Sequence, residues 1–209
     1  MRARAKLFLA SSNPGKLEEF RALAQTSTPG MTDALNARVE IELLPRFDSL
    51  PSFEEDAATF AENAAGKALH YSRLGVGRVF ADDSGLVVPT LGGVPGVHSA
   101  RYAGPNATSA ERIAKLLGEL RGKEGNERAA YFVCAIALAE RGRAIGIVAA
   151  RVDGEILESP RGSGGFGYDP VFYFPALKRT FAELLQEEKN RISHRGKAFR
   201  KMLSSLTTS

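Results

Sequence analysis

Two adjacent carboxylates at the end of an apolar run most constrain the fold, in the segment Phe80-Ala81-Asp82-Asp83-Ser84-Gly85-Leu86. The pattern predicts a buried strand over residues 78–82, followed by a turn at the glycine. The two acids would then lie at the rim of a sheet, where ligands bind in open α/β folds. Because neighbouring like charges oppose each other's ionisation, the pair indicates a site that receives a cation.

The apolar patterns around this strand are typical of an α/β protein. Further strands are expected over residues 6–11, 39–44, 131–139 and 144–152, and residues 140–143 would join the last two as a hairpin. Helices are expected from the Asn-Pro-Gly turn to residue 25, and over residues 59–74, 108–118, 180–186 and 193–206, with residues 26–37 as a loop. We therefore predict a mixed sheet flanked by helices, in one domain that covers residues 1–209.

Composition limits the partners that this chain can have. Hydrophobic residues make up 44% of the 209 residues, and no apolar run approaches the ~20 residues that span a bilayer. The basic start lacks the apolar segment of a signal peptide, so we expect a cytoplasmic protein without a membrane partner. The net charge of +4 permits an anionic ligand, but no basic patch with exposed aromatics predicts binding to a nucleic-acid polymer. A single cysteine, Cys134, excludes an internal disulfide and is expected to be a buried structural thiol.

A candidate phosphate loop follows the first predicted strand, with the sequence Ser11-Ser12-Asn13-Pro14-Gly15-Lys16. Backbone N–H groups at a helix N-terminus favour an anion, Gly15 allows close approach, and Lys16 adds a positive charge. The segment is not a Walker A loop, because leucine stands where that motif has Ser or Thr. An ordinary strand-to-helix turn is the alternative interpretation.

A second acidic segment, Glu54-Glu55-Asp56, precedes the helix expected from Thr59. Mg²⁺ takes one or two protein carboxylates and fills its remaining positions with water and substrate phosphates. The acids of the two segments are therefore candidate Mg²⁺ ligands, although acidic loop residues are commonly only solvated.

Near the C-terminus, the segment Gly164-Gly165-Phe166-Gly167-Tyr168-Asp169-Pro170 combines glycines with aromatic residues. Glycines let a backbone approach a flat ligand, and Phe166 or Tyr168 could stack on a base. A turn with its aromatic rings in the core is equally compatible with the pattern. His194 stands apart from the other histidines because Ser193, Arg195 and Gly196 surround it at the start of the last predicted helix.

In this order, the motifs resemble those of the inosine/xanthosine triphosphate pyrophosphatases, and the resemblance covers residues 6–206. They are Ser-x-Asn-x-Gly-Lys, Glu-Glu-x-x-x-Thr-Phe-x-Glu-Asn-Ala, Ala-Asp-Asp-Ser-Gly-Leu, Gly-Gly-x-Pro-Gly-x-x-Ser-Ala-Arg-Tyr, Gly-Gly-Phe-Gly-Tyr-Asp-Pro and Ser-His-Arg-Gly. The resemblance implies an elongated mixed-sheet fold with two lobes and a central cleft, a homodimer and dependence on Mg²⁺. It also implies hydrolysis of ITP, dITP and XTP to the monophosphate and pyrophosphate.

The resemblance also implies roles for individual residues. Glu55 and Asp83 match metal ligands, and Asp83 matches the general base. The positions that match substrate contacts are Ser11, Ser12, Asn13, Pro14, Gly15, Lys16, Ser84, Phe166, Gly167, Tyr168, Asp169, Lys189, His194 and Arg195. Two other functions stay open: a related pyrophosphatase for modified pyrimidine nucleotides, and a non-catalytic module that binds nucleotides or RNA.

Overall fold

The computed structural model describes residues 5–25, 39–74 and 77–206. Seven strands form one mixed sheet in the order β2-β1-β3-β4-β5-β6-β7. These are β1 (Ala5–Leu9), β2 (Val39–Leu43), β3 (Arg78–Val87), β4 (Ala129–Glu140), β5 (Arg143–Ile156), β6 (Phe172–Phe174) and β7 (Arg179–Thr180). The principal helices are α1 (Pro14–Gln25), α3 (Phe60–Ser72), α4 (Ser109–Glu119), α5 (Gln186–Ile192) and α6 (His194–Ser205). The mixed α/β class is thereby confirmed.

The chain divides into two compact units, each built from separate stretches of sequence. Unit 1 comprises residues 1–83, 134–150 and 195–209, and unit 2 comprises residues 84–133 and 151–194. The expected cleft between two lobes stays a prediction. Among the described residues, no helix is long and apolar enough to cross a membrane.

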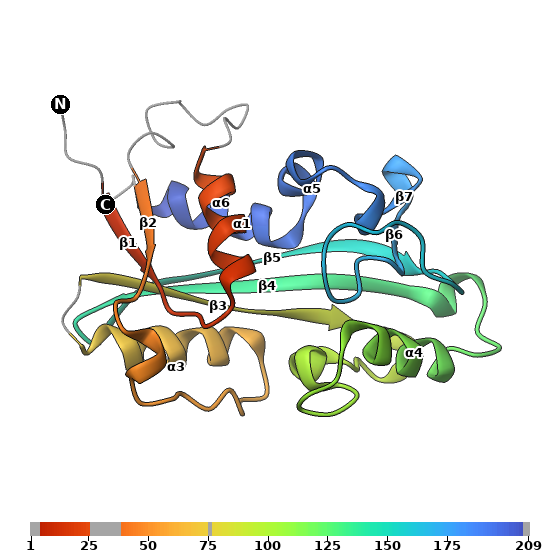
Figure 1. Cartoon of the computed structure of the whole chain (residues 1–209), viewed down its shortest axis with the longest axis horizontal. Coiled ribbons are helices and arrows are strands. Elements are labelled where there is room, and N and C mark those ends of the chain that lie inside the picture. The colour runs from red at the N-terminus through yellow and green to blue at the C-terminus, as the bar shows by residue number, and fades with distance from the viewer. Residues whose placement is uncertain (1–4, 26–38, 75–76, 207–209) are drawn as a thin grey trace. The chain divides into compact units, whose positions relative to one another are not determined.

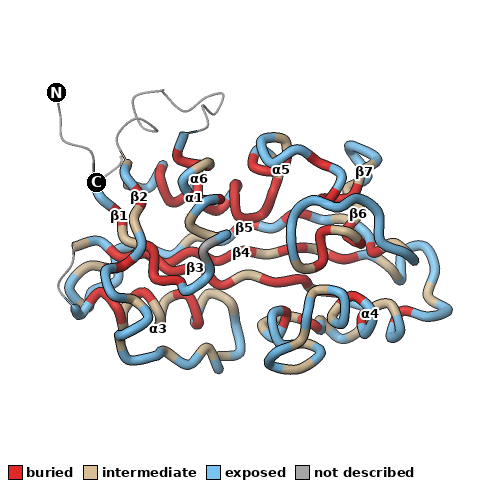
Figure 2. Tube along the Cα trace, viewed as in Figure 1, coloured by how far each residue is buried: buried red, intermediate tan, exposed pale blue. Residues whose placement is uncertain are grey.

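In unit 1, helices cover both faces of the sheet. Helices α1 and α6 pack on one face, where the rings of Phe20, Phe80 and Phe199 meet, and α3 packs on the other (Figure 1). β1 pairs in parallel with both β2 and β3, so their carboxyl ends share one edge. Figure 2 shows the buried positions concentrated along the sheet and on the helix faces turned toward it. The predicted burial of Cys134 in this core is confirmed.

Unit 2 has a core of its own, built around β6 and the helix α4. The rings of Phe132, Phe172 and Phe181 pack together there, with centroids 4.6–5.8 Å apart. Helix α4 begins at the predicted place because Thr108 and Glu111 form a capping box. The hairpin between β4 and β5 turns at Arg141 and Gly142, both with positive φ, as a two-residue type I′ turn requires.

Two local predictions were wrong. β3 does not end at Asp82 but continues through Gly85 to Val87, so the two acids lie within a strand and not at its end. Residues 180–186 are not one helix, because β7 and a short 3₁₀ turn precede α5, which begins at Gln186. The helix expected after the Asn-Pro-Gly turn is confirmed, with Pro14 as its first residue. The predicted loop over residues 26–37 lies outside the described residues.

Candidate functional site

The candidate phosphate loop connects β1 to α1 and is held by its own side chains. The Ser11 hydroxyl oxygen accepts a hydrogen bond from the N–H of Asn13 (3.1 Å), and the Asn13 Oδ1 accepts one from the N–H of Gly15 (2.9 Å). Ser12, Asn13 and Gly15 are exposed, whereas Ser11 is buried. The loop therefore has a fixed shape and presents an exposed turn at a helix N-terminus, as anion binding requires.

The neighbouring acids of β3 make contacts on opposite faces of the sheet, as alternation along a strand requires. Asp82 is fully buried, with Oδ1 2.9 Å from Lys16 Nζ and Oδ2 3.5 Å from Arg195 Nε. Asp83 contacts α3 instead, where its Oδ2 accepts a hydrogen bond from Asn63 Nδ2 (2.9 Å). Asp82 is therefore bound to two cations while Asp83 contacts an amide on α3, yet the charge of Asp82 still raises the pKa of Asp83, as expected of adjacent acids.

This difference in surroundings moves the pKa values of the two carboxyls in opposite directions. Burial raises the pKa of Asp82, but the charges of Lys16, Arg195 and Lys67 outweigh it and hold the pKa well below its usual range. Burial raises the pKa of Asp83 most, the hydrogen bond from Asn63 lowers it and the charge of Glu55 raises it, so that the pKa lies at about 6. Asp83 therefore combines burial with a pKa close to neutrality, as a general base requires.

Glu55 joins the same centre from the segment before α3. Its Oε1 forms an ion pair with Lys67 Nζ, and its charge is near enough to act on the carboxyl of Asp83. Burial lowers the pKa of Lys67, but Glu55, Asp82 and Asp83 together raise it above its ordinary value. Unit 1 thus brings the two predicted metal ligands and Lys16 into one electrostatic centre.

Helix α3 organises this centre through two residues that sequence reasoning missed. Asn63 donates to Asp83 through Nδ2, and its Oδ1 accepts from the N–H of Ala57, two residues after Glu55. Lys67 lies one helical turn further on, so it emerges on the same face as Asn63. The spacing of an amide and a lysine four residues apart, beside two acidic segments, was the available signal.

A third missed residue, Glu19 on α1, completes a buried ionic network. Its Oε2 forms an ion pair at 2.5 Å with Nη1 of Arg195, and the side chains of both residues are at most 4% exposed. Arg195 thus joins Glu19 to Asp82. Burial lowers the pKa of the Arg195 guanidinium, but the charges of the two carboxylates raise it above its ordinary value. In unit 1 this arginine fixes the position of Asp82, which in turn holds Lys16.

Within the described residues, no group of three or more His, Cys, Asp or Glu side chains could hold a metal by itself. Glu55 and Asp83 are two carboxylates in mutual electrostatic contact, and one of them is strongly desolvated. A hard cation that keeps water and phosphate ligands suits such a pair. The residues present therefore fit Mg²⁺ with two protein ligands.

The candidate base loop lies in unit 2 and is fixed by Asp169. The Oδ2 of Asp169 accepts from the N–H of Phe166 (2.7 Å) and from Nζ of Lys189 (2.6 Å), and both charged side chains are buried. A Cβ at Gly165 would lie 2.1 Å from that oxygen, and φ is +71°, so only glycine fits there. Asp169 therefore holds the loop and the lysine.

The aromatic residues of this loop differ in exposure. Phe166 is 49% exposed and lies 4.8 Å from Lys189 Nζ, whereas Tyr168 is buried and its hydroxyl donates to the carbonyl of Ser99 (3.0 Å). The ring of Phe166 can receive a base and the ring of Tyr168 cannot. The imidazole of His194 is also fixed in unit 2, stacked on Phe132 at 4.7 Å with an interplanar angle of 11°.

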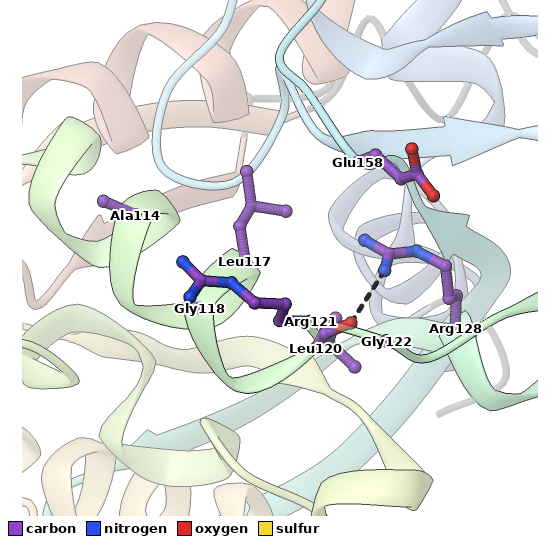
Figure 3. Close-up of a pocket in the computed structure, with 8 residues that line it drawn as sticks. All are labelled: Ala114, Leu117, Gly118, Leu120, Arg121, Gly122, Arg128 and Glu158. Carbon is purple, nitrogen blue, oxygen red and sulfur yellow. Dashed lines mark hydrogen bonds between the residues drawn. The ribbon is translucent and has the colours of Figure 1, made fainter.

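A cavity of about 380 Å³ lies elsewhere in unit 2, at the end of α4. Figure 3 shows Arg128 at its wall, where the guanidinium donates to main-chain carbonyls, among them that of Leu120 (3.0 Å). None of the predicted site residues lines this cavity: Ala114, Leu117, Gly118, Leu120, Arg121, Gly122, Arg128 and Glu158. The candidate site therefore rests on the side-chain network and not on cavity volume.

Fold and site together define a mixed-sheet α/β protein with an acidic centre beside a strand-to-helix anion loop. The chain belongs to the Ham1 family, whose profile matches residues 7–205. It is 50% identical over 197 residues to the dITP/XTP pyrophosphatase of Geobacillus kaustophilus strain HTA426, covering 94% of this chain and 92% of that protein. It is also 50% identical over 199 residues to the dITP/XTP pyrophosphatase of Gloeobacter violaceus, covering 95% and 92%.

Solved structures of the same family share the fold. A HAM1 protein from Coxiella burnetii superposes with a TM-score of 0.81 at 42% identity, covering 98% of this chain and 99% of that chain. The Ham1 protein of Staphylococcus aureus gives a TM-score of 0.82 at 35% identity, with the same coverage. The family expected from the motifs is thereby confirmed.

Proposed function

We propose that this protein hydrolyses non-standard purine nucleoside triphosphates (ITP, dITP and XTP) to the monophosphate and pyrophosphate. The observation that carries the proposal is the convergence of Glu55, Asp83 and Lys16 in unit 1, beside a preformed anion loop. The names of the similar proteins support the substrate class. Such an activity removes damaged nucleotides from the pool, which fits the predicted cytoplasmic location.

Glu55 and Asp83 are the proposed ligands of Mg²⁺, which when bound supplies positive charge to the phosphate oxygens. Lys67 balances the charge of Glu55 through their ion pair. Ser11 to Lys16 would receive the triphosphate at the N-terminus of α1, with the ammonium of Lys16 as a donor. Because Lys16 is held by Asp82, its charge is positioned before the substrate arrives.

Asp83 is the proposed general base. It would accept a proton from a water molecule whose oxygen attacks the α-phosphorus, while the bond from that phosphorus to the bridging oxygen breaks and pyrophosphate leaves. A pKa of about 6 lets the carboxylate be ionised at neutral pH and still accept a proton in the transition state. Lys16 would stabilise the charge that develops on the leaving pyrophosphate.

Unit 2 supplies the proposed recognition of the base. The exposed ring of Phe166 is the stacking surface, and Asp169 and Lys189 hold its loop. Hypoxanthine and xanthine carry a carbonyl acceptor at position 6, where adenine has an amine donor. Donors from His194 or the nearby backbone of unit 2 would pair with that carbonyl, whereas each buried donor that adenine left unpaired would cost about 1–3 kcal/mol. The guanidinium of Arg195, also expected to contact the substrate, is instead bound to Glu19 and Asp82 in unit 1.

The decisive experiment measures pyrophosphate release from ITP, dITP, XTP, GTP, ATP and modified pyrimidine triphosphates, with Mg²⁺ and with EDTA. We expect rapid, Mg²⁺-dependent release from the first three only. Preferred turnover of the pyrimidines would select the related pyrophosphatase instead. Salt-dependent RNA binding without any pyrophosphate release would select a binding module.

We also propose a homodimer, and one surface of unit 1 supports it. The first five residues of β5 are all exposed, including Ile145 (45%) and Ile147 (48%), and exposed apolar strand ends commonly mark an interface. Replacing both isoleucines by glutamate should shift the mass measured by light scattering from dimer to monomer. A wild-type protein that is monomeric at micromolar concentration would refute the homodimer.

A further inference from the structure

The segment that carries Glu55 runs as an extended strand-like stretch along α3 without belonging to the sheet (Figure 1). From Pro51 to Ala57 its residues alternate in exposure, with Phe53, Glu55 and Ala57 partly buried and their neighbours exposed. This alternation explains why Glu55 reaches the acidic centre while the carboxylates on either side of it remain in solvent.

Two hydrogen bonds tie the ends of the segment to α3. Nε2 of His70 lies 3.1 Å from the carbonyl oxygen of Pro51, and the N–H of Ala57 donates to Oδ1 of Asn63 (2.9 Å). The contacts run backward along the helix as the segment runs forward, so the two lie antiparallel. Glu55 lies between these anchors, in a stretch that is outside the sheet.

Between the anchors, the ring of Phe53 sits directly against Gly66 in the middle of α3. A Cβ at Gly66 would lie 2.5 Å from Cζ and 3.1 Å from Cε2 of that ring. Gly66 lies within a regular α-helix, where alanine is strongly preferred to glycine. Helix formation thus disfavours this glycine, and close contact with Phe53 is the feature of the structure that requires it.

We propose that the contact between Phe53 and Gly66 is a positioning device, which sets the distance of Glu55 from α3 and thereby the affinity of the centre for a divalent cation. This inference rests on the proposed function, because it takes Glu55 to be a metal ligand. Phe53 precedes Glu55 by two residues and faces the same side, so a shift of the backbone at Phe53 is carried to the carboxylate of Glu55. Displacements of about 1 Å at a reacting centre can reduce rates about 100-fold.

Gly66→Ala tests the contact, because the added methyl group must push the ring outward. We expect Mn²⁺, titrated into the substrate-free enzyme by calorimetry or electron paramagnetic resonance, to bind at least tenfold more weakly. The amide of Ala57 should also exchange its hydrogen faster, since the displaced segment loses its bond to Asn63. The matched control is Gly118→Ala on α4, where a Cβ meets nothing within 4 Å. It should leave both quantities unchanged.

A second substitution shows whether Gly66→Ala acts through its contact with Phe53 or by destabilising α3 as a whole. Phe53→Leu removes the ring atoms that clash, so in the Gly66→Ala background it should restore most of the Mn²⁺ affinity and the protection of Ala57. Wild-type Mn²⁺ affinity in Gly66→Ala, or a loss that Phe53→Leu does not relieve, would overturn the proposal. If the wild-type enzyme released no pyrophosphate but bound Mn²⁺ with this same dependence, the proposed function would fail while the positioning role stood.

Discussion

Replacing Asp83 by asparagine should abolish turnover and also make the metal-free protein more stable. The pKa of Asp83 is raised from an ordinary 3.8 to about 6, first by burial and then by the charge of Glu55, against the hydrogen bond from Asn63. Each pKa unit corresponds to 1.36 kcal/mol, so the ionised carboxylate destabilises the fold by about 3 kcal/mol relative to its protonated form. Asparagine is neutral at every pH, and its amide oxygen can still accept from Asn63.

The upward shift in the pKa of Asp83 determines how the free energy of unfolding depends on pH. A raised carboxyl pKa means that the folded protein holds the proton more tightly than the unfolded chain does. The protonated Asp83 carboxyl therefore stabilises the folded protein fully below pH 3.8, and this contribution is lost as the pH rises through about 6. Between pH 4.5 and pH 8 the variant should therefore gain about 2 kcal/mol on the wild type, about 4–8 °C in Tm for a chain of this size.

Thermal unfolding in EDTA at pH 4.5, 6 and 8 measures this gain. Asp82→Asn is the matched control, because the pKa of that carboxyl is lowered by Lys16 and Arg195 against the effect of burial, so its removal should destabilise the protein near neutral pH. A difference between wild type and Asp83→Asn that stays constant with pH would refute the electrostatic account of Asp83.

Three further substitutions test other parts of the site. Phe166→Ala should raise KM for ITP about 5- to 100-fold with a smaller effect on kcat, because base stacking contributes about 1–3 kcal/mol; equal kinetics would remove Phe166 from base binding. Arg195→Met leaves Glu19 and Asp82 as buried carboxylates without that partner and should lower the free energy of unfolding by about 3–5 kcal/mol in urea titrations; an unchanged midpoint would contradict this. Burial raises the pKa of the Cys134 thiol, so the native enzyme should resist iodoacetamide until urea unfolds it, and rapid labelling would show that the core opens.

Sequence alone predicted the parts of the fold whose causes are local. The N-cap of α3 at Thr59 followed from a glutamate three residues later, and the hairpin followed from two strand-like runs joined by the short segment of residues 140–143. It also singled out Glu55 and Asp83, which the structure brings into electrostatic contact. Their roles as metal ligands stay predictions.

The errors arose where distant residues decide the local structure. Asp-Asp-Ser-Gly is a poor strand sequence, yet β3 continues through it because Asp82 is bound by Lys16, 66 positions earlier, and by Arg195, 113 positions later. No local pattern reveals partners at those separations. The same holds for Glu19, whose contact with Arg195 spans 176 positions and gives a helix residue a role in the buried network.

The position of the two acids within β3, and not beyond its end, has a chemical consequence. Successive side chains of a strand point to opposite faces, so one carboxylate meets two cations while its neighbour meets an amide and another acid. The first is held ionised and fixes Lys16, and the second keeps a pKa near neutrality and is available to a cation or a proton. Two identical residues thus acquire different chemistry from strand geometry alone. Any insertion that shifts β3 by one residue would therefore exchange their surroundings and disable the centre.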